Sequence, residues 1–300
     1  MTPKIHALQT GWVQIKRAQM ASVGTGLARP YHVLLDSEWS DWVPIYAWLI
    51  EHEDGPILVD TGETSRVHDR GYHPRWHPFY RLASRFRVTP DDEIGPQLRA
   101  IGIAPSDIQQ VVLTHLHTDH AGGLSHVADR PAWVHPLEWQ RAQGFSGKIQ
   151  GYLPHRWPPA WRPRMITFEK RAHRPFEDQM PLTRSGDVVI LPTPGHTPGH
   201  VSVLVQGSPS IFLAGDTSYT EDLLQRHVVD GVSPDEGVAR ETIDRILQQA
   251  NDEPLVYLPS HDPASAMRLS QQRVLSEFDP PSDGRKSSSL PLNKTARIRA

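Results

Sequence analysis

The sequence contains no cysteine among its 300 residues. This absence excludes disulfide bonds and thiolate metal ligands, so a metal site in this chain has to use imidazole and carboxylate groups. The chain also lacks an apolar run of about 18 residues, the length that a membrane-spanning helix needs. Its first residues lack the apolar segment of a secretory signal. We therefore expect a cytoplasmic protein with no membrane partner.

An excess of charge of one sign is missing as well. The chain carries 31 Lys and Arg against 34 Asp and Glu, and the formal net charge is -3. A nucleic-acid partner needs a basic surface, which this balance does not indicate, so we expect no nucleic-acid partner. Hydrophobic residues make up 38% and charged residues 22%, which is typical of a folded protein with a core.

Short runs rich in Val, Ile, Leu and aromatic residues, bounded by Gly, Pro and Asp, predict strands. They cover residues 11–16, 43–52, 56–62, 108–115, 132–136, 187–195, 200–207, 210–216 and 254–261. Helical spacing of apolar residues predicts helices at 91–102, 233–250 and 262–278, the second with Ser233 as its N-cap. This order predicts an α/β sandwich of two mostly antiparallel sheets with helices outside.

Two segments do not follow these patterns. Residues 67–88 are aromatic and basic and fit neither the helical nor the strand period. Residues 279–300 are rich in Pro, Ser and basic side chains, so we expect a disordered tail there. We expect residues 1–278 to form a single domain.

The densest motif is "THLHTDHAGG", residues 114–123, directly after the apolar run "IQQVVL". On a strand, residues two apart share a face, so we expect His115 and His117 to converge on one ion. Asp119 and His120 then point elsewhere, and two adjacent ions would use all four side chains.

Three further ligand-type residues each follow a predicted strand. They are His196 in "TPGHT", Asp216 in "FLAGD" and His261 in "YLPSH". The ends of strands are where an α/β scaffold places a site, so we expect them to join the first motif. Imidazole and carboxylate ligands suit zinc, iron, manganese or cobalt, and the residues alone leave this choice open.

This set of motifs resembles the metallo-beta-lactamase superfamily over about residues 5–275. The resemblance implies a four-layer αβ/βα sandwich with a dinuclear site for two divalent ions, zinc ahead of iron, manganese and cobalt. It assigns one ion to His115, His117 and His196, the other to Asp119, His120 and His261, and a bridging role to Asp216. It also implies that Asp60 of "LVDTG" supports the ligand loop.

Within the superfamily, the absence of cysteine disfavours the β-lactamases that use a cysteine ligand. In "GDTSYT", Tyr219 lies three residues after Asp216, which resembles the N-acyl homoserine lactonases, as do "TGWVQIK" and "TPGHTPGHVS". This resemblance implies quorum quenching by attack of metal-bound hydroxide on the lactone ring of a small-molecule substrate. Tyr219 would stabilise the carbonyl oxygen and Asp119 would donate a proton to the leaving oxygen.

Other functions remain open at this stage. The alternatives are a phosphotriesterase, an aryl esterase or a glyoxalase II-like thioesterase of the same fold, a redox di-iron protein, and a non-catalytic relative. The last is disfavoured because all seven ligand positions are filled. The resemblance implies a homodimer, and residues 67–88 would either cover the site or build the interface. Candidate walls of an acyl groove are Met20, Trp39, Trp42, Trp76, Phe79, Tyr80 and Phe86.

Overall fold

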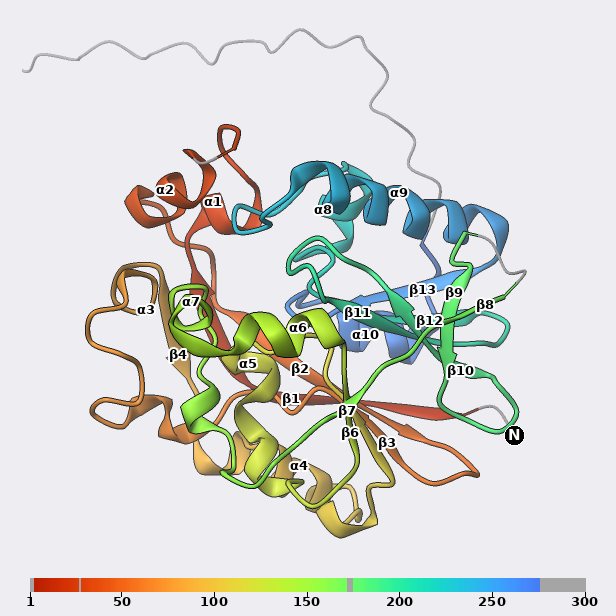
Figure 1. Cartoon of the computed structure of the whole chain (residues 1–300). Coiled ribbons are helices and arrows are strands. Elements are labelled where there is room, and N and C mark those ends of the chain that lie inside the picture. The colour runs from red at the N-terminus through yellow and green to blue at the C-terminus, as the bar shows by residue number, and fades with distance from the viewer. Residues whose placement is uncertain (1–2, 27, 172–174, 276–300) are drawn as a thin grey trace, which may run out of the picture.

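The computed structural model describes residues 3–275 apart from residue 27 and residues 172–174, so the predicted tail at 279–300 lies outside the described part. Two sheets face each other with helices on their outer sides (Figure 1). The first sheet has the order β4 (Ser84–Arg87), β1 (Lys4–Ile15), β2 (Val43–Glu51), β3 (Ile57–Val59), β5 (Gln110–Val112), β6 (Ala132–Val134) and β7 (Arg164–Met165). The second has the order β13 (Leu255–Pro259), β12 (Ser210–Gly215), β11 (Val201–Val205), β10 (Val188–Pro192), β9 (Asp178–Pro181) and β8 (Glu169–Lys170).

Pairing is mixed in both sheets. The first sheet is antiparallel from β4 to β3 and parallel from β3 to β7. The second is antiparallel except for the parallel pair β12 and β13. The predicted α/β sandwich is confirmed, and the parallel half of the first sheet is an addition to it.

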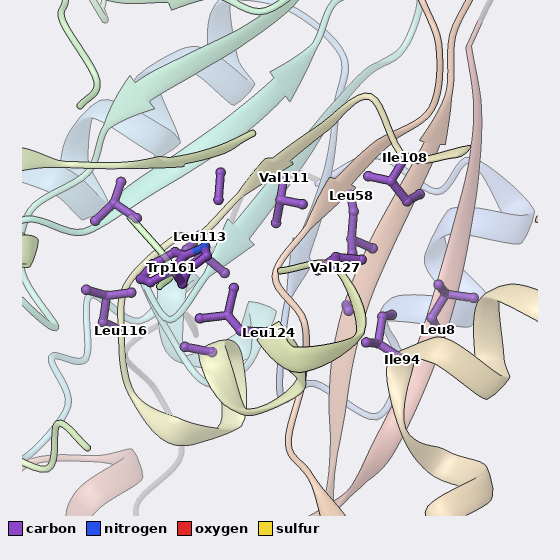
Figure 2. Packing of buried hydrophobic residues seen from close by; sticks show 14 of the residues in the cluster. Leu8, Leu58, Ile94, Ile108, Val111, Leu113, Leu116, Leu124, Val127 and Trp161 are labelled. Carbon is purple, nitrogen blue, oxygen red and sulfur yellow. The ribbon is translucent and has the colours of Figure 1, made fainter. Parts of the chain in front are cut away.

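The alternation of side chains along the strands builds the core. In β2, Trp48 and Ile50 face a buried cluster shared with the second sheet, whereas Ala47 and Leu49 face a cluster on the other side. Figure 2 shows this outer cluster, in which Ile94 packs near strand residues such as Leu58. Both faces of the strand are therefore buried, which explains its nearly continuous apolar sequence.

Helices cover the outer faces of the two sheets. On the first sheet these include α4 (Ile94–Ala100) and α5 (Thr118–Ala121), and on the second α8 (Glu221–Gln225) and α9 (Glu236–Asp252). The remaining α-helices are α1 (Arg17–Met20), α2 (Ala28–Leu35), α3 (Pro78–Leu82), α6 (Pro136–Ala142), α7 (Gly144–Ile149) and α10 (Ser265–Gln271). Short 3-10 helices are η1 (Ser65–His68), η2 (Pro90–Asp92), η3 (Pro105–Asp107), η4 (Gly122–His126) and η5 (Pro154–Arg156). Within the described residues, no helix combines the length and apolarity needed to cross a membrane.

Several predicted boundaries are wrong for local reasons. Helix α9 begins after Asp235, whose carboxylate accepts the N–H groups of the first turn, whereas the predicted cap Ser233 hydrogen-bonds to Asp230 instead. The predicted helix 262–278 is shorter, because Gln272 takes a left-handed conformation that ends α10. In residues 67–88 the structure places α3 and β4, elements too short to show a period.

Candidate metal centre

The predicted ligand residues meet at one edge of the sandwich because of how the strands run. β10 and β12 are both antiparallel to β11, and β13 is parallel to β12, so these three strands end on the same side. His196, Asp216 and His261 follow β10, β12 and β13. The first motif follows β5, which ends in the facing sheet.

The first motif converges by a different route from the predicted one. Strand β5 ends at Val112, so His115 and His117 lie in the loop behind it and not on a strand face. His117 then directly precedes α5, which carries Asp119 and His120. The prediction that strand alternation aligns His115 with His117 is therefore wrong in its mechanism, although the two side chains do come together.

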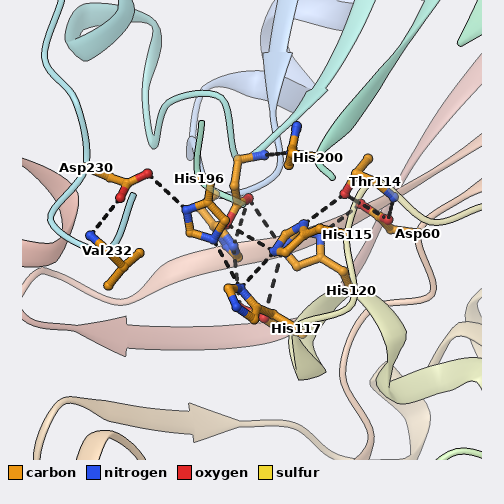
Figure 3. A network of polar contacts seen from close by, with 12 residues as sticks. Asp60, Thr114, His115, His117, His120, His196, His200, Asp230 and Val232 are labelled. Carbon is orange, nitrogen blue, oxygen red and sulfur yellow. Dashed lines mark hydrogen bonds and ion pairs between the residues drawn. The ribbon is translucent and has the colours of Figure 1, made fainter. Parts of the chain in front are cut away.

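One group of ring nitrogens points at a common position (Figure 3). His115 Nε2 lies 3.0 Å from His117 Nδ1, which lies 3.1 Å from His196 Nε2. Nitrogen ligands at 2.0–2.1 Å from a tetrahedral zinc ion would lie about 3.3 Å from one another. The spacing of the three imidazoles therefore suits a single ion.

A second group forms beside the first. His261 Nε2 lies 3.5 Å from Asp119 Oδ2, and His120 Nε2 lies 4.0 Å from Asp119 Oδ1. The ligand atoms of these three residues lie within 4.8 Å of one another, as do those of the first group. These separations are longer than the 3.0 and 3.1 Å of the first group, so a cation could lie between the three ligand atoms.

Asp216 lies between the two groups and offers one oxygen to each. Its Oδ2 atom is 3.5 Å from His196 Nε2. Its Oδ1 atom is 3.3 Å from His120 Nε2 and 3.4 Å from His261 Nε2. This arrangement suits a carboxylate that bridges two ions.

Two buried atoms test whether this donor set fits a cation. His120 Nε2 and Asp216 Oδ1 are inaccessible to solvent and lie 3.3 Å apart, but neither forms a hydrogen bond of good geometry among the described residues. Buried polar atoms are nearly always satisfied, because an unpaired one raises the free energy of the fold. A divalent cation would supply the missing partner for both, so the residues fit the predicted ions.

The electrostatics of the site divide its histidines. Burial lowers the pKa of His115 and His117, whereas burial is outweighed by the facing carboxylates, which raise the pKa, at His120, His196 and His261. Burial and the neighbouring His196 lower the pKa of His117 to about 3. Burial acts against ionisation of Asp216, but His261 and His120 hold the pKa of its carboxyl well below the usual value. Neutral imidazole and ionised carboxylate are the forms that bind metal ions.

The ligand side chains are themselves held in place. His120 Nδ1 lies 2.8 Å from Asp60 Oδ2, and Asp60 Oδ1 accepts the backbone N–H of Thr114 at 2.8 Å. Asp60 has a left-handed backbone with φ 62°, a strained conformation that is typical of functional positions. Its contacts agree with the supporting role predicted for it.

Two residues that hold proposed ligands in place were not predicted from the sequence. Asp230 Oδ2 lies 3.0 Å from His196 Nδ1, and His200 Nε2 accepts the backbone N–H of Asp216 at 3.0 Å. His200 is the second histidine of "PGHTPGH", which was a usable signal. Asp230 lies in a loop without a recognisable motif, so nothing near it in the sequence indicates its contact.

Tyr219 lies beside both groups. Its ring centroid is 5.6 Å from that of His261 and 6.4 Å from that of His196. Burial, with a further contribution from Asp216, raises the pKa of the Tyr219 hydroxyl well above its usual value, so the phenol stays neutral. Asp119 is more open, with 18% of its side chain exposed.

Among the predicted wall residues, Tyr80 lies near the proposed ligands, whereas three tryptophans make other contacts. A Cβ atom on Gly151 would lie 3.6 Å from the Tyr80 hydroxyl and 3.7 Å from His117, so Tyr80 is close to the ligand loop. Trp39 and Trp42 instead pack against cations, the former against Lys16 and Arg85 and the latter against Arg87. Trp76 stacks on Phe145 with 51% of its surface exposed.

Comparisons with known proteins agree with this geometry. The family model of the metallo-beta-lactamase superfamily matches residues 40–261. The chain is 30% identical over 229 residues to an N-acyl homoserine lactonase of a Bacillus species, covering 73% of this chain and 82% of the relative. It is 29% identical over 225 residues to the lactonase AiiA of Bacillus thuringiensis subsp. kurstaki, with the same coverage.

A solved structure shares the fold over most of the chain. It is an N-acyl homoserine lactone hydrolase with the product N-hexanoyl-L-homoserine bound at its catalytic metal centre. The TM-score is 0.72 at 25% identity, and the match covers 91% of this chain and 98% of the other.

Proposed function

This chain belongs to the metallo-beta-lactamase superfamily and is a hydrolase of that superfamily, and we propose that it opens the lactone ring of N-acyl homoserine lactones. The observation that carries the proposal is the combination of two adjacent ligand groups with Tyr219 beside both of them. The similarity to lactonases, one of them with an acyl homoserine product at its metal centre, supports the same substrate class.

We propose that the site holds two divalent ions, with zinc as the first expectation. His115, His117 and His196 would hold one, Asp119, His120 and His261 the other, and Asp216 would contact both. When bound, such ions lower the pKa of water towards neutrality and polarise an ester carbonyl.

The other side chains supply binding and proton transfer. The neutral Tyr219 hydroxyl would donate a hydrogen bond to the carbonyl oxygen as negative charge develops there. Asp119 is the proposed proton donor to the ring oxygen as it leaves. Its partly exposed carboxylate would first take the proton released by the attacking water and then pass it to that oxygen. The product would be an open hydroxy acid.

The test combines metal analysis with a substrate panel. We expect about two ions per chain and acid release, in a pH-indicator assay, from homoserine lactones of several acyl lengths. Paraoxon, an aryl ester and a thioester are the comparison substrates, since the alternative hydrolases of this fold would prefer them. Turnover of a thioester or phosphotriester with inert lactones would contradict the lactonase proposal.

We also propose a homodimer. Large apolar side chains are exposed on α2, on α3 and on the neighbouring α7, which lie on one side of the molecule (Figure 1). Tyr31 and Leu35 are each 62% exposed and Phe145 is 69% exposed, and such side chains are typical of interface centres. Light scattering on the purified protein should give about twice the chain mass of 33.8 kDa, and a monomer at micromolar concentration would contradict the proposal.

A further inference from the structure

The hydroxyl of Tyr219 has one hydrogen-bond partner among the described residues, and it comes from the far end of the chain. The side-chain amide Nε2 of Gln19, on α1, donates to the Tyr219 oxygen at 2.7 Å across 200 positions of sequence. Both side chains are buried, with Gln19 6% and Tyr219 3% exposed. No solvent therefore competes for this bond.

The buried surroundings of the amide explain why it donates to the tyrosine. In the present orientation the only unsatisfied atom of the Gln19 side chain is its carbonyl oxygen Oε1. Turning the amide over would instead leave its NH₂ group buried without this acceptor. Buried N–H groups without partners are rarer than under-satisfied carbonyl oxygens, so the donating orientation is favoured.

A donated hydrogen bond decides what the phenol can do next. Because the amide occupies a lone pair of the Tyr219 oxygen, the phenol hydrogen has to point away from Gln19. Among the described residues, Tyr219 donates no side-chain hydrogen bond of its own, so this hydrogen is available. A phenol oxygen that accepts a hydrogen bond is also a better donor, because linked hydrogen bonds polarise one another.

We propose that Gln19 is a positioning residue for the reaction. Its amide holds the Tyr219 hydroxyl so that the phenol hydrogen faces the substrate carbonyl oxygen. This inference rests on the proposed function, since it assigns Gln19 a role through Tyr219 in the same site.

The short helix α1 is well anchored for such a role. The Gln19 carbonyl accepts the N–H of Gly231 at 2.8 Å, and the N–H of Ala18 donates to Asp36 Oδ2 at 2.7 Å. A Cβ atom on Gly231 would lie 2.1 Å from the Ala18 carbonyl oxygen, so the two segments are in close contact. Gly231 follows Asp230, the partner of His196, and the same loop therefore supports a ligand and the Gln19 backbone.

A double-mutant cycle tests the proposal. Gln19→Met keeps the length of the side chain but removes the donor, and we expect kcat for the lactone to fall about 5- to 10-fold with little change in KM. In a Tyr219→Phe background the same substitution should have no further effect, because no hydroxyl remains to be oriented. Arg17→Ala is the matched control, since this exposed side chain lies on the same helix and should leave kcat unchanged.

Gln19→Glu provides a second variant with the opposite hydrogen-bond character. An ionised carboxylate only accepts, so it would capture the phenol hydrogen and lower kcat at least as much as Tyr219→Phe does. Wild-type kcat in this variant, at a pH where the new carboxyl group is ionised, would overturn the proposal. Equal losses from Gln19→Met in both backgrounds would also overturn it, because the side chain would then act through packing alone.

These outcomes are separable from those of the proposed function. If the wild-type protein does not hydrolyse lactones, the substrate assignment is wrong. The double-mutant cycle is then measured on whichever thioester, aryl ester or phosphotriester the wild-type protein does hydrolyse. With lactone turnover intact, additive losses contradict the Gln19 assignment alone. If Tyr219→Phe leaves kcat unchanged, then Tyr219 takes no part in the reaction, and Gln19 has no role through it.

Discussion

His200 accepts a hydrogen bond from the backbone N–H of Asp216 at 3.0 Å, although it belongs to neither group of proposed metal ligands. Its other ring nitrogen lies 3.1 Å from the carbonyl oxygen of Thr193, so the ring spans two strand ends. Gly215 leaves space for this contact, because a Cβ there would lie 2.5 Å from His200 Nε2. The backbone that presents Asp216 is therefore held by a histidine.

We expect His200→Ala to weaken metal binding by about 10- to 100-fold, because residues that orient ligands have effects of this size. The metal-to-protein ratio after dialysis against a weak chelator would measure the loss, and kcat should fall with occupancy. His227→Ala is the control, since His227 forms an exposed ion pair with Asp244. A variant that retains the wild-type metal-to-protein ratio under the same dialysis would contradict the role of His200.

Asp60→Asn should also weaken metal binding, by about 10-fold or more, because it removes the negative charge beside His120 while keeping the shape of the side chain. Asparagine tolerates the left-handed backbone at this position, so the fold should persist. Isothermal titration of the metal-free variant with zinc would measure the change. Unchanged affinity would show that the Asp60 carboxylate only supports the loop backbone.

His117→Ala should lose metal and activity together, because His117 Nδ1 lies near the nitrogens of both His115 and His196. Elemental analysis after gel filtration would then find less than the wild-type amount of metal. If this variant keeps the wild-type stoichiometry, the assignment of His117 as a ligand is wrong.

Removing the metal should lower the stability of the wild-type protein. A ligand that binds only the folded state stabilises it by about 2.7 kcal/mol when its concentration is 100 times its Kd. We therefore expect a lower melting temperature after treatment with a chelator and recovery after adding zinc. Comparing zinc, manganese, iron and cobalt in this recovery would identify the ion that stabilises the folded state most.

Arg268 offers a test of stability that changes none of the proposed ligands. Its guanidinium is 2% exposed and contacts Asp262 Oδ2 at 2.5 Å and Glu221 Oε2 at 3.2 Å. Arg268→Met would leave Asp262 without a cationic partner and Glu221 with Arg273 as its only one among the described residues. We therefore expect a loss of about 3–5 kcal/mol in the free energy of unfolding, measured with urea. The exposed pair of Arg226 and Asp222 is the control, where Arg226→Ala should cost about 0.5 kcal/mol or less.

Much of the fold and most of the site could be predicted because the relevant signals are local. Strands such as β2 and β10 are short apolar runs that end at Gly, Pro or charged residues. His196, Asp216 and His261 each follow such a run, so the rule that sites lie at strand ends was enough to bring them together.

The remaining features depend on tertiary contacts. Whether Asp230 supports His196 is decided by a loop that returns 34 residues later, and no pattern near Asp230 indicates it. Gln19 contacts Tyr219 across 200 positions of sequence, so no local pattern indicates this pair. The start of α9 was mispredicted because Ser233 and Asp235 are both good caps, and hydrogen bonding of Ser233 to Asp230 decided between them.

The ligand groups also join the two halves of the sandwich. His115, His117, Asp119 and His120 follow a strand of the first sheet, whereas His196, Asp216 and His261 follow strands of the second. An ion in either group would therefore cross-link the sheets at an edge where no covalent bond does so. In this cysteine-free chain, such ions would take the place of disulfides, and with ions bound the two sheets should unfold in one transition.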